Sequence, residues 1–234
     1  MPWILVSMLS RLADDADALF DETDAVLRSR GEAPVATHYR DLFAWLAERL
    51  GGSVWIERSG SSVDYLGDLA RLFPDGRFVH LHRDGREAAL SIRAHPFYRL
   101  AVSLLYDRVP DVDEGEDVVG AMLESMPPVE LFGRYWSDQL LSGFAALPRL
   151  DRDQYLAVRF EDVVADPGTW MARLADFFAL PGDPGFPARA AALVEGAPRS
   201  RFGDLAPNEQ DRLVEACRPG QMLLGRDPAR PPTD

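Results

Sequence analysis

The chain has 234 residues, a formal net charge of −13 at neutral pH and no lysine, so every strongly basic side chain is an arginine. This acidic balance disfavours general binding to nucleic acid or anionic membranes, and the absence of lysine excludes a Gly-Lys-Ser/Thr phosphate loop and lysine Schiff-base chemistry. No apolar run approaches the length of a transmembrane helix, so we expect a globular protein without a membrane span. The single cysteine, Cys217, excludes an internal disulfide and is typical of a cytoplasmic protein.

Two helices are predicted in the N-terminal part, over residues 10–30 and 38–50. Apolar residues recur at helical spacing in both, and Gly51-Gly52 ends the second. Six acidic residues lie on the opposite face of the first helix: Asp14, Asp15, Asp17, Asp21, Glu22 and Asp24. They lack the glycine-centred spacing of a calcium loop, so we interpret them as a solvated face and expect no metal site.

A β-α-β unit is predicted next. Val54-Trp55-Ile56 supplies a short buried strand, a helix is expected over 64–72, and a second strand over 77–82. Strands joined in this way pair in parallel, with a right-handed crossover.

The remaining pattern indicates one α/β domain over residues 1–225 without internal repeats. Its further predicted elements are a surface insertion over 107–128, helices over 129–146 and 207–217, a strand over 155–160, a helix that opens at Asp166-Pro167, and a disordered tail over 226–234.

The most informative segment runs from Arg77 to Ser91, where strand formers are followed by a tight turn and the start of a helix predicted over 84–94. Asp84 is expected to cap this helix. Glu87 follows three residues later, where it is expected to bond back to the cap.

Positive charge gathers at the same turn, because Arg83 and Arg86 lie where the free N–H groups of a helix start attract anions. Arg83 at the strand end and Ser91 in the helix are spaced to converge on one phosphate. The alternative is an ordinary strand–helix corner with solvated arginines. The combination resembles the 3'-phosphate-binding segment of sulfotransferases that use 3'-phosphoadenosine-5'-phosphosulfate (PAPS). This resemblance implies that Arg83 and Ser91 hold the 3'-phosphate, and that a P-loop NTPase-like parallel sheet flanked by helices forms the fold.

Two later segments add to the resemblance. Phe160-Glu161-Asp162-Val163 is similar to the family motif Tyr-Glu-Asp-Leu, which implies that Phe160 contacts the adenine of PAPS; plain core packing is the alternative. Glu161 and Asp162 are expected to fix the local backbone. Arg201 lies in a segment that loosely resembles the basic, glycine-containing loop that closes over the 3'-phosphate in the family.

The loop Glu57-Arg58-Ser59-Gly60 occupies the place where related enzymes carry a Lys-Thr/Ser pair after a strand. The resemblance implies that Arg58 and Ser59 face the transferring sulfuryl group, where a cation stabilises developing charge. Glu57 is a candidate general base for the acceptor, or else one half of a surface Glu–Arg pair.

The resemblance covers about residues 53–225 and lacks the family's N-terminal loop for the 5'-phosphosulfate, Gly-x-x-Arg-Ser-Gly-Thr-Thr. We therefore expect either an incomplete N-terminal part or a degenerate one. The function that the resemblance implies is transfer of a sulfuryl group from PAPS to a hydroxyl or amine of a small molecule, without a metal. A non-catalytic nucleotide-binding or protein-interaction member of the same fold is the alternative.

Overall fold

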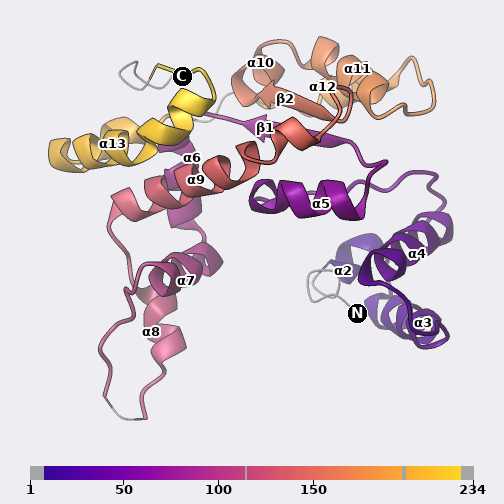
Figure 1. The fold of residues 1–234 in the computed structure, drawn as a ribbon, viewed down its shortest axis with the longest axis horizontal. Helices are drawn as coiled ribbons and strands as arrows, with labels where there is room; N and C mark the ends of the chain where they lie inside the picture. Colours follow the sequence, from indigo (N-terminus) through magenta and orange to yellow (C-terminus); the bar gives the residue numbers. More distant parts are fainter. Residues whose placement is uncertain (1–7, 114, 197–198, 228–234) are drawn as a thin grey trace. The chain divides into compact units, whose positions relative to one another are not determined.

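The computed structural model describes residues 8–113, 115–196 and 199–227 (Figure 1). The chain forms two compact units, residues 1–59 and residues 60–234, and each has its own apolar core. The single domain over 1–225 stays a prediction. Residues 228–234, most of the predicted tail, lie outside the described residues.

The described part of the first unit contains the helices α2 (Leu9–Leu12), α3 (Ala16–Arg28) and α4 (Val35–Arg49). The helix predicted over 10–30 is interrupted, because Asp15 caps α3 by accepting a hydrogen bond from the Ala18 N–H at 2.9 Å. The second predicted helix is confirmed as α4. The buried side chains of this unit include Leu9, Leu19, Leu42 and Leu46.

The prediction of a buried strand at Val54-Trp55-Ile56 is wrong. Residues 54–59 form no regular element, and all of them are exposed. Trp55 instead stacks on the ring of Phe43 in α4, with the ring centroids 4.8 Å apart. A strand needs a neighbouring backbone as well as suitable side chains, and local propensity alone does not supply one. The predicted β-α-β unit therefore lacks its first strand in the described structure.

The second unit contains a parallel sheet of two strands, β1 (Phe78–His82) and β2 (Tyr155–Arg159). Their register runs from Phe78 opposite Tyr155 to His82 opposite Arg159. Both strands were predicted, and the α/β class with parallel strands is confirmed. Because parallel strands end at the same edge, the residues that follow His82 and Arg159 are brought to one place.

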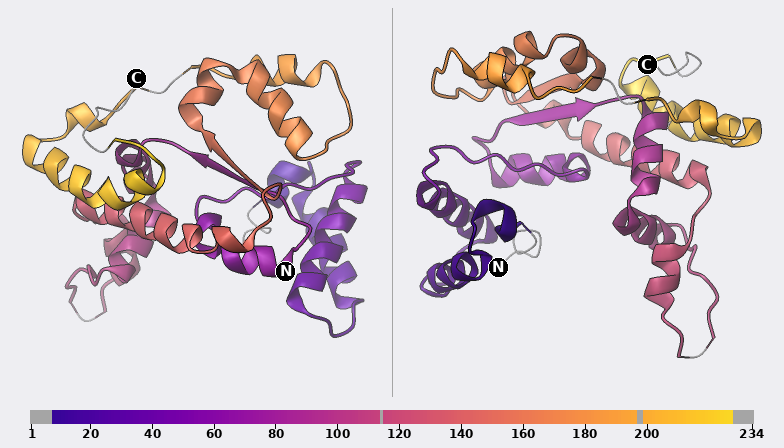
Figure 2. Two further views of the ribbon diagram at one scale, coloured as in Figure 1. Left: turned by 45° about the horizontal axis from the view of Figure 1, so that its top comes forward. Right: turned by 180° about the vertical axis from the view of Figure 1, so that it is seen from behind.

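Helices surround this sheet, with α5 and α9 on one side of the strands and α10, α11 and α12 on the other (Figures 1 and 2). Their bounds are α5 (Leu66–Leu72), preceded by a 3-10 turn (Ser62–Tyr65), α6 (Gly85–Ala94), α7 (Pro96–Leu105), α8 (Val118–Glu124), α9 (Val129–Phe144), α10 (Phe160–Ala165), α11 (Pro167–Phe177), α12 (Phe186–Ala191) and α13 (Pro207–Leu223). Shorter 3-10 turns span Leu147–Arg149 and Phe202–Asp204.

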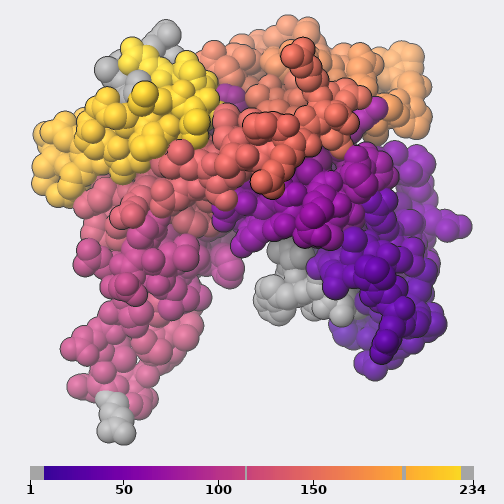
Figure 3. Space-filling model, in the orientation of Figure 1, coloured from indigo at the N-terminus to yellow at the C-terminus, as the bar shows by residue number. Residues whose placement is uncertain are grey.

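Three of these helices depart from the sequence-based expectations. α8 lies inside the segment predicted as a surface insertion, α10 begins directly at the end of β2, and α13 continues six residues beyond 217. Within the second unit, α7 and α8 extend away from the strands (Figure 1), and their residues form a projection in the space-filling view (Figure 3). Among the described residues, no helix is long and apolar enough to cross a membrane.

The core of the second unit lies where α6, α9 and α13 pack together. Trp136 of α9 belongs to this core and lies against two glycines, Gly85 at the start of α6 and Gly220 in α13. Cys217 is fully buried in the same core, and burial raises the pKa of its thiol. The first turn of α6 is thus fixed by tight packing as well as by its cap.

We predict that Gly85→Ala destabilises the protein by about 1–3 kcal/mol, the usual cost of overpacking a core. A Cβ at position 85 would overlap the Trp136 ring, whereas a Cβ at Gly168 in α11 would meet nothing within 4 Å. Gly168→Ala is therefore the matched control, and it should stabilise the helix by up to about 1 kcal/mol. Denaturant unfolding measures both variants; equal effects at the two positions would contradict the packing account.

Candidate functional site: a cationic strand–helix corner

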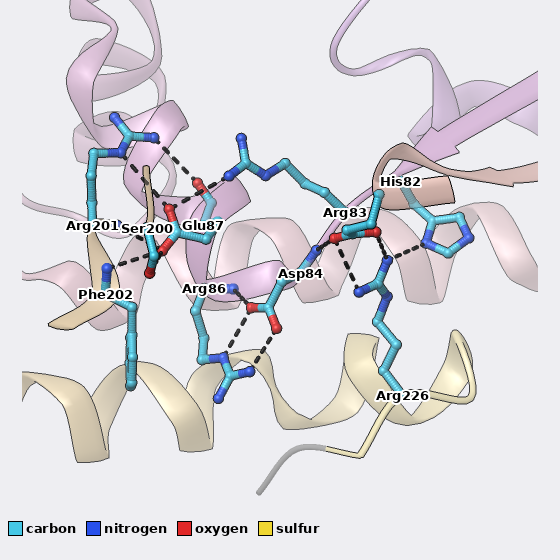
Figure 4. A network of polar contacts seen from close by, with 10 residues as sticks. His82, Arg83, Asp84, Arg86, Glu87, Ser200, Arg201, Phe202 and Arg226 are labelled. Atoms are coloured by element: carbon cyan, nitrogen blue, oxygen red, sulfur yellow. Dashed lines mark hydrogen bonds and ion pairs between the residues drawn. The ribbon is translucent and has the colours of Figure 1, made fainter. Parts of the chain in front are cut away.

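The site is the turn between β1 and α6, where Asp84 caps the helix (Figure 4). Its Oδ1 accepts hydrogen bonds from the Arg86 backbone N–H and from Arg86 Nε, both at 2.9 Å, and its Oδ2 accepts one from Arg86 Nη2 at 2.6 Å. The Arg86 side chain is only 3% exposed. Burial alone raises the pKa of Asp84, but the hydrogen bonds and charge of Arg86 outweigh it and lower that pKa.

Arg86 therefore does not supply the solvent-facing charge that the sequence predicted. Its guanidinium is the internal counter-ion of Asp84, and it also lies over the ring of Phe202 at 5.1 Å. A buried, bidentate pair of this kind fixes the turn rather than attracting ligands.

The second correction concerns Glu87, which was predicted to bond back to the cap of α6. Its Oε1 instead accepts hydrogen bonds from the Ser200 hydroxyl at 2.7 Å, the Arg201 N–H at 2.9 Å and the Phe202 N–H at 3.0 Å (Figure 4). These donors lie more than a hundred residues away in the chain, so the local sequence around Glu87 does not predict them. The segment 200–202 is thereby tied to the first turn of α6.

The N–H of the capping residue finds a different acceptor. Asp84 N donates to Glu161 Oε1 at 3.2 Å, and the same carboxylate accepts bonds from Arg226 Nη1 and Nη2 at 3.3 and 2.7 Å. Hydrogen bonds from Arg226 overcome the effect of burial and lower the pKa of Glu161. Glu161 was predicted to fix the local backbone; the backbone group that it binds here belongs to Asp84, 77 residues earlier in the chain.

Three of the predicted cofactor-binding residues come together at this corner. Arg83 lies over the ring of Phe160, with its guanidinium carbon 5.5 Å from the ring centroid. Arg83 Nη2 and Arg201 Nε approach the same oxygen of Glu87, Oε2, at 3.5 and 3.9 Å. Desolvation lowers the pKa of Arg83, although the nearby Glu87 opposes that shift. Two cations and an aromatic face therefore share one side of the turn.

Ser91, the fourth predicted cofactor-binding residue, is exposed on α6. It lies one helical turn after Glu87 and hence on the same face of the helix. Its convergence with Arg83 on one phosphate stays a prediction.

The predicted catalytic residues Glu57, Arg58 and Ser59 are exposed and lie in the first unit, outside any regular element. Their relation to the corner stays a prediction. Gly60, the next residue, belongs to the second unit, where a Cβ at this position would overlap the hydroxyl of Tyr98 in α7. A larger residue here would require the Tyr98 side chain to move.

Arg226 and Ser200 are the site residues that sequence reasoning missed. Arg226 was assigned to a disordered tail, yet its side chain is 12% exposed and binds Glu161. It also lies 3.5 Å from Nδ1 of His82. Nothing in the local sequence of either residue indicates its partner, because both contacts depend on the packed position of a distant helix or strand.

Two neighbouring histidines on β1 add buried, uncharged polar groups behind the corner. His80 Nδ1 lies 2.9 Å from the Tyr155 hydroxyl, and the ring centroids of His80 and His82 are 5.3 Å apart. Burial lowers the pKa of His80 to about 4. In His82, burial together with the neighbouring His80 and Arg226 likewise lowers the pKa to about 4. Both rings are therefore neutral in the folded protein at neutral pH.

Comparison with known protein families identifies the family of this chain. Residues 10–184 match the model of the sulfotransferase family. The chain belongs to the sulfotransferase family. The match includes both strands, the turn between β1 and α6 and most of the first unit, and it ends before the segment Ser200–Phe202 and Arg226. It begins well before residue 53, where the motif resemblance starts.

Among solved structures, the sulfotransferase-family chain is similar to the sulfotransferase domain from the curacin biosynthetic pathway. The two share 15% sequence identity, over 80% of this chain and 68% of that one, with a TM-score of 0.46. A search of curated proteins finds no match.

We predict that Arg86→Met costs about 3–5 kcal/mol of stability, because it leaves the buried Asp84 carboxylate without its counter-ion. The double variant Asp84→Asn, Arg86→Met removes both charges and keeps a side chain that caps helices, so it should recover a large part of the loss. Chemical denaturation of the two variants checks this. An Arg86→Met protein as stable as the wild type would show that the pair does not hold the turn.

A further prediction concerns acid stability. Since the folded-state pKa of His80 is about 4 and its ordinary value is 6.5, the unfolded chain takes up a proton first as the pH falls. The contribution of the neutral His80 ring to the free energy of unfolding is therefore fully present above pH 6.5. It is lost as the pH falls from about 6.5 to 4. His80→Phe keeps a ring beside Phe144 but has no proton to gain, so its unfolding free energy should fall less steeply over this range. Identical pH profiles of unfolding free energy for His80→Phe and the wild type would contradict the lowered pKa of His80.

Proposed function

We propose that this member of the sulfotransferase family transfers a sulfuryl group from PAPS to a hydroxyl or amine of a small molecule. The observation that carries the proposal is the grouping of Arg83, Phe160 and Arg201 at the strand–helix corner. The family membership supplies the class of reaction, and the corner supplies groups suited to the nucleotide that donates the sulfuryl group.

The donor set of the corner suits a phosphate. Arg83 and Arg201 are 25% and 43% exposed, whereas the Glu87 carboxylate between them is 5% exposed. Their contacts to Glu87, at 3.5 and 3.9 Å, are longer than the 2.7–2.9 Å of a strong charge-assisted hydrogen bond. Both guanidiniums therefore keep donors toward the solvent side, where a 3'-phosphate would bind, with Ser91 on the same helix face.

Phe160 provides an aromatic face at the end of β2, and in our proposal it contacts the adenine ring. Arg83 lies over this ring, so the arginine that recognises the phosphate also orders the surface that recognises the base. Phenylalanine supports stacking alone, since it has no hydroxyl for an additional hydrogen bond.

PAPS supplies the sulfuryl group together with a good leaving group, the adenosine bisphosphate. The residues of the chain would bind and orient this donor, stabilise charge and move one proton. We assign charge stabilisation to Arg58 and Ser59, and removal of the proton from the acceptor to Glu57. The proposal requires that the exposed segment Glu57–Ser59 lies beside the bound nucleotide.

Calorimetric titration with adenosine 3',5'-bisphosphate and adenosine 5'-monophosphate tests the site. One charge-assisted contact is worth about 1.5–3 kcal/mol, so the wild type should prefer the bisphosphate by roughly ten- to a hundredfold. Arg83→Ala should lose most of this preference. Arg71→Ala, which removes an exposed arginine paired with Asp68 on α5, should keep it.

The two negative outcomes have different meanings. A folded wild-type protein without preference for the 3'-phosphate would refute the cofactor assignment. Preference for the bisphosphate without transfer from PAPS to a panel of phenols, alcohols and amines would instead support a nucleotide-binding protein that lacks catalysis.

A further inference from the structure

Among the described residues of the corner, the carboxylate of Glu87 accepts the most hydrogen bonds. Although charged, its side chain is 5% exposed. Its Oε1 accepts three hydrogen bonds, all from the segment Ser200–Phe202. Burying a carboxylate is costly unless hydrogen bonds and opposite charges compensate it, and here both kinds of compensation come from the segment that carries Arg201 and from Arg83.

The two oxygens of this carboxylate have separate partners. Oε1 receives the uncharged donors of the segment, at 2.7–3.0 Å, whereas Oε2 lies 3.5 and 3.9 Å from the Arg83 and Arg201 guanidiniums. Arg201 Nη2 additionally donates to the Glu87 backbone carbonyl at 3.5 Å. The close contacts therefore fix the backbone of the segment, and the long ones leave two cations side by side on the more exposed side of the carboxylate.

An acidic residue in the first turn of a helix is common, because it interacts favourably with the helix dipole. That effect needs no partner outside the helix. The three donors to Glu87 Oε1 come from residues that are 113 to 115 positions away, so the helix dipole does not account for this arrangement.

We propose that Glu87 is a positioning residue, which docks the segment Ser200–Phe202 on α6 and so holds Arg201 beside Arg83 as a two-arginine clamp for a phosphate group. The role of the clamp rests on the proposed function. Glu87 itself touches no ligand in this account, because its carboxylate lies buried behind the two guanidiniums.

A double-variant cycle tests whether Glu87 acts through Arg201. The readout is the ratio of the dissociation constants for adenosine 5'-monophosphate and adenosine 3',5'-bisphosphate. Glu87→Ala and Arg201→Ala should each lower this ratio about tenfold, the size of one charge-assisted contact, and the double variant should lower it no further. Partial unfolding of the Glu87→Ala protein would weaken the binding of both nucleotides by the same factor and leave the ratio unchanged. A lowered ratio therefore does not come from lost stability. An unchanged ratio, or losses that multiply, would overturn the proposal.

The conservative variant separates docking from charge. Glu87→Gln keeps an amide oxygen that accepts hydrogen bonds from the segment but has no negative charge. We expect its ratio to stay within about threefold of the wild type, because the segment remains docked. A loss as large as that of Glu87→Ala would overturn positioning by docking and favour a purely electrostatic role.

Hydrogen exchange at the Arg201 and Phe202 amides measures docking without any nucleotide. Both amides should be protected in the wild type and in Glu87→Gln, and exchange at least about tenfold faster in Glu87→Ala. Unprotected amides in the wild type would overturn the docking role while the proposed function stands. Protected amides in a protein without 3'-phosphate preference would overturn the proposed function, and the clamp with it.

Discussion

Three carboxylates, each with its own partners, fix the turn between β1 and α6; Asp84 and Glu87 are buried and Glu161 is half-buried. Asp84 is neutralised by Arg86, Glu87 by the segment 200–202 with two arginines, and Glu161 by Arg226. Because an unpaired buried charge is costly, the buried carboxylates of Asp84 and Glu87 require these partners. The turn is thereby tied to β2 through α10, to the segment before α13 and to the residues after it.

This arrangement explains how a strongly acidic chain presents a cationic site. The carboxylates face inward and are satisfied there, while Arg83 and Arg201 keep part of their surface toward solvent. Arginine suits this task, because one planar guanidinium can contact a carboxylate, an aromatic ring and a phosphate on different edges and faces. Phe160 joins the same surface because the parallel strands end together, which places the residue after β2 beside the residues after β1.

Features set by neighbouring residues were predictable from the sequence. The two strands and the cap at Asp84 follow from local patterns. Features that depend on distant partners were not. Val54-Trp55-Ile56 has strand-forming side chains but packs Trp55 on Phe43 instead, and Glu87 and Arg226 bind residues far away in the chain. The resemblance to family motifs led us to expect Arg83, Phe160 and Arg201 at one site, but it does not indicate which contacts hold them there.

The central claim is that the exposed edges of Arg83 and Arg201 recognise a 3'-phosphate. Nuclear magnetic resonance of the arginine Nε–H groups tests it most directly, since these signals report on the guanidiniums themselves. The account predicts that adenosine 3',5'-bisphosphate shifts the Nε–H signals of Arg83 and Arg201 and leaves that of the buried Arg86 nearly unmoved. Adenosine 5'-monophosphate, which lacks the 3'-phosphate, should shift the signals of Arg83 and Arg201 far less. Equal responses to both nucleotides, or signals of Arg83 and Arg201 that respond to neither, would contradict the account.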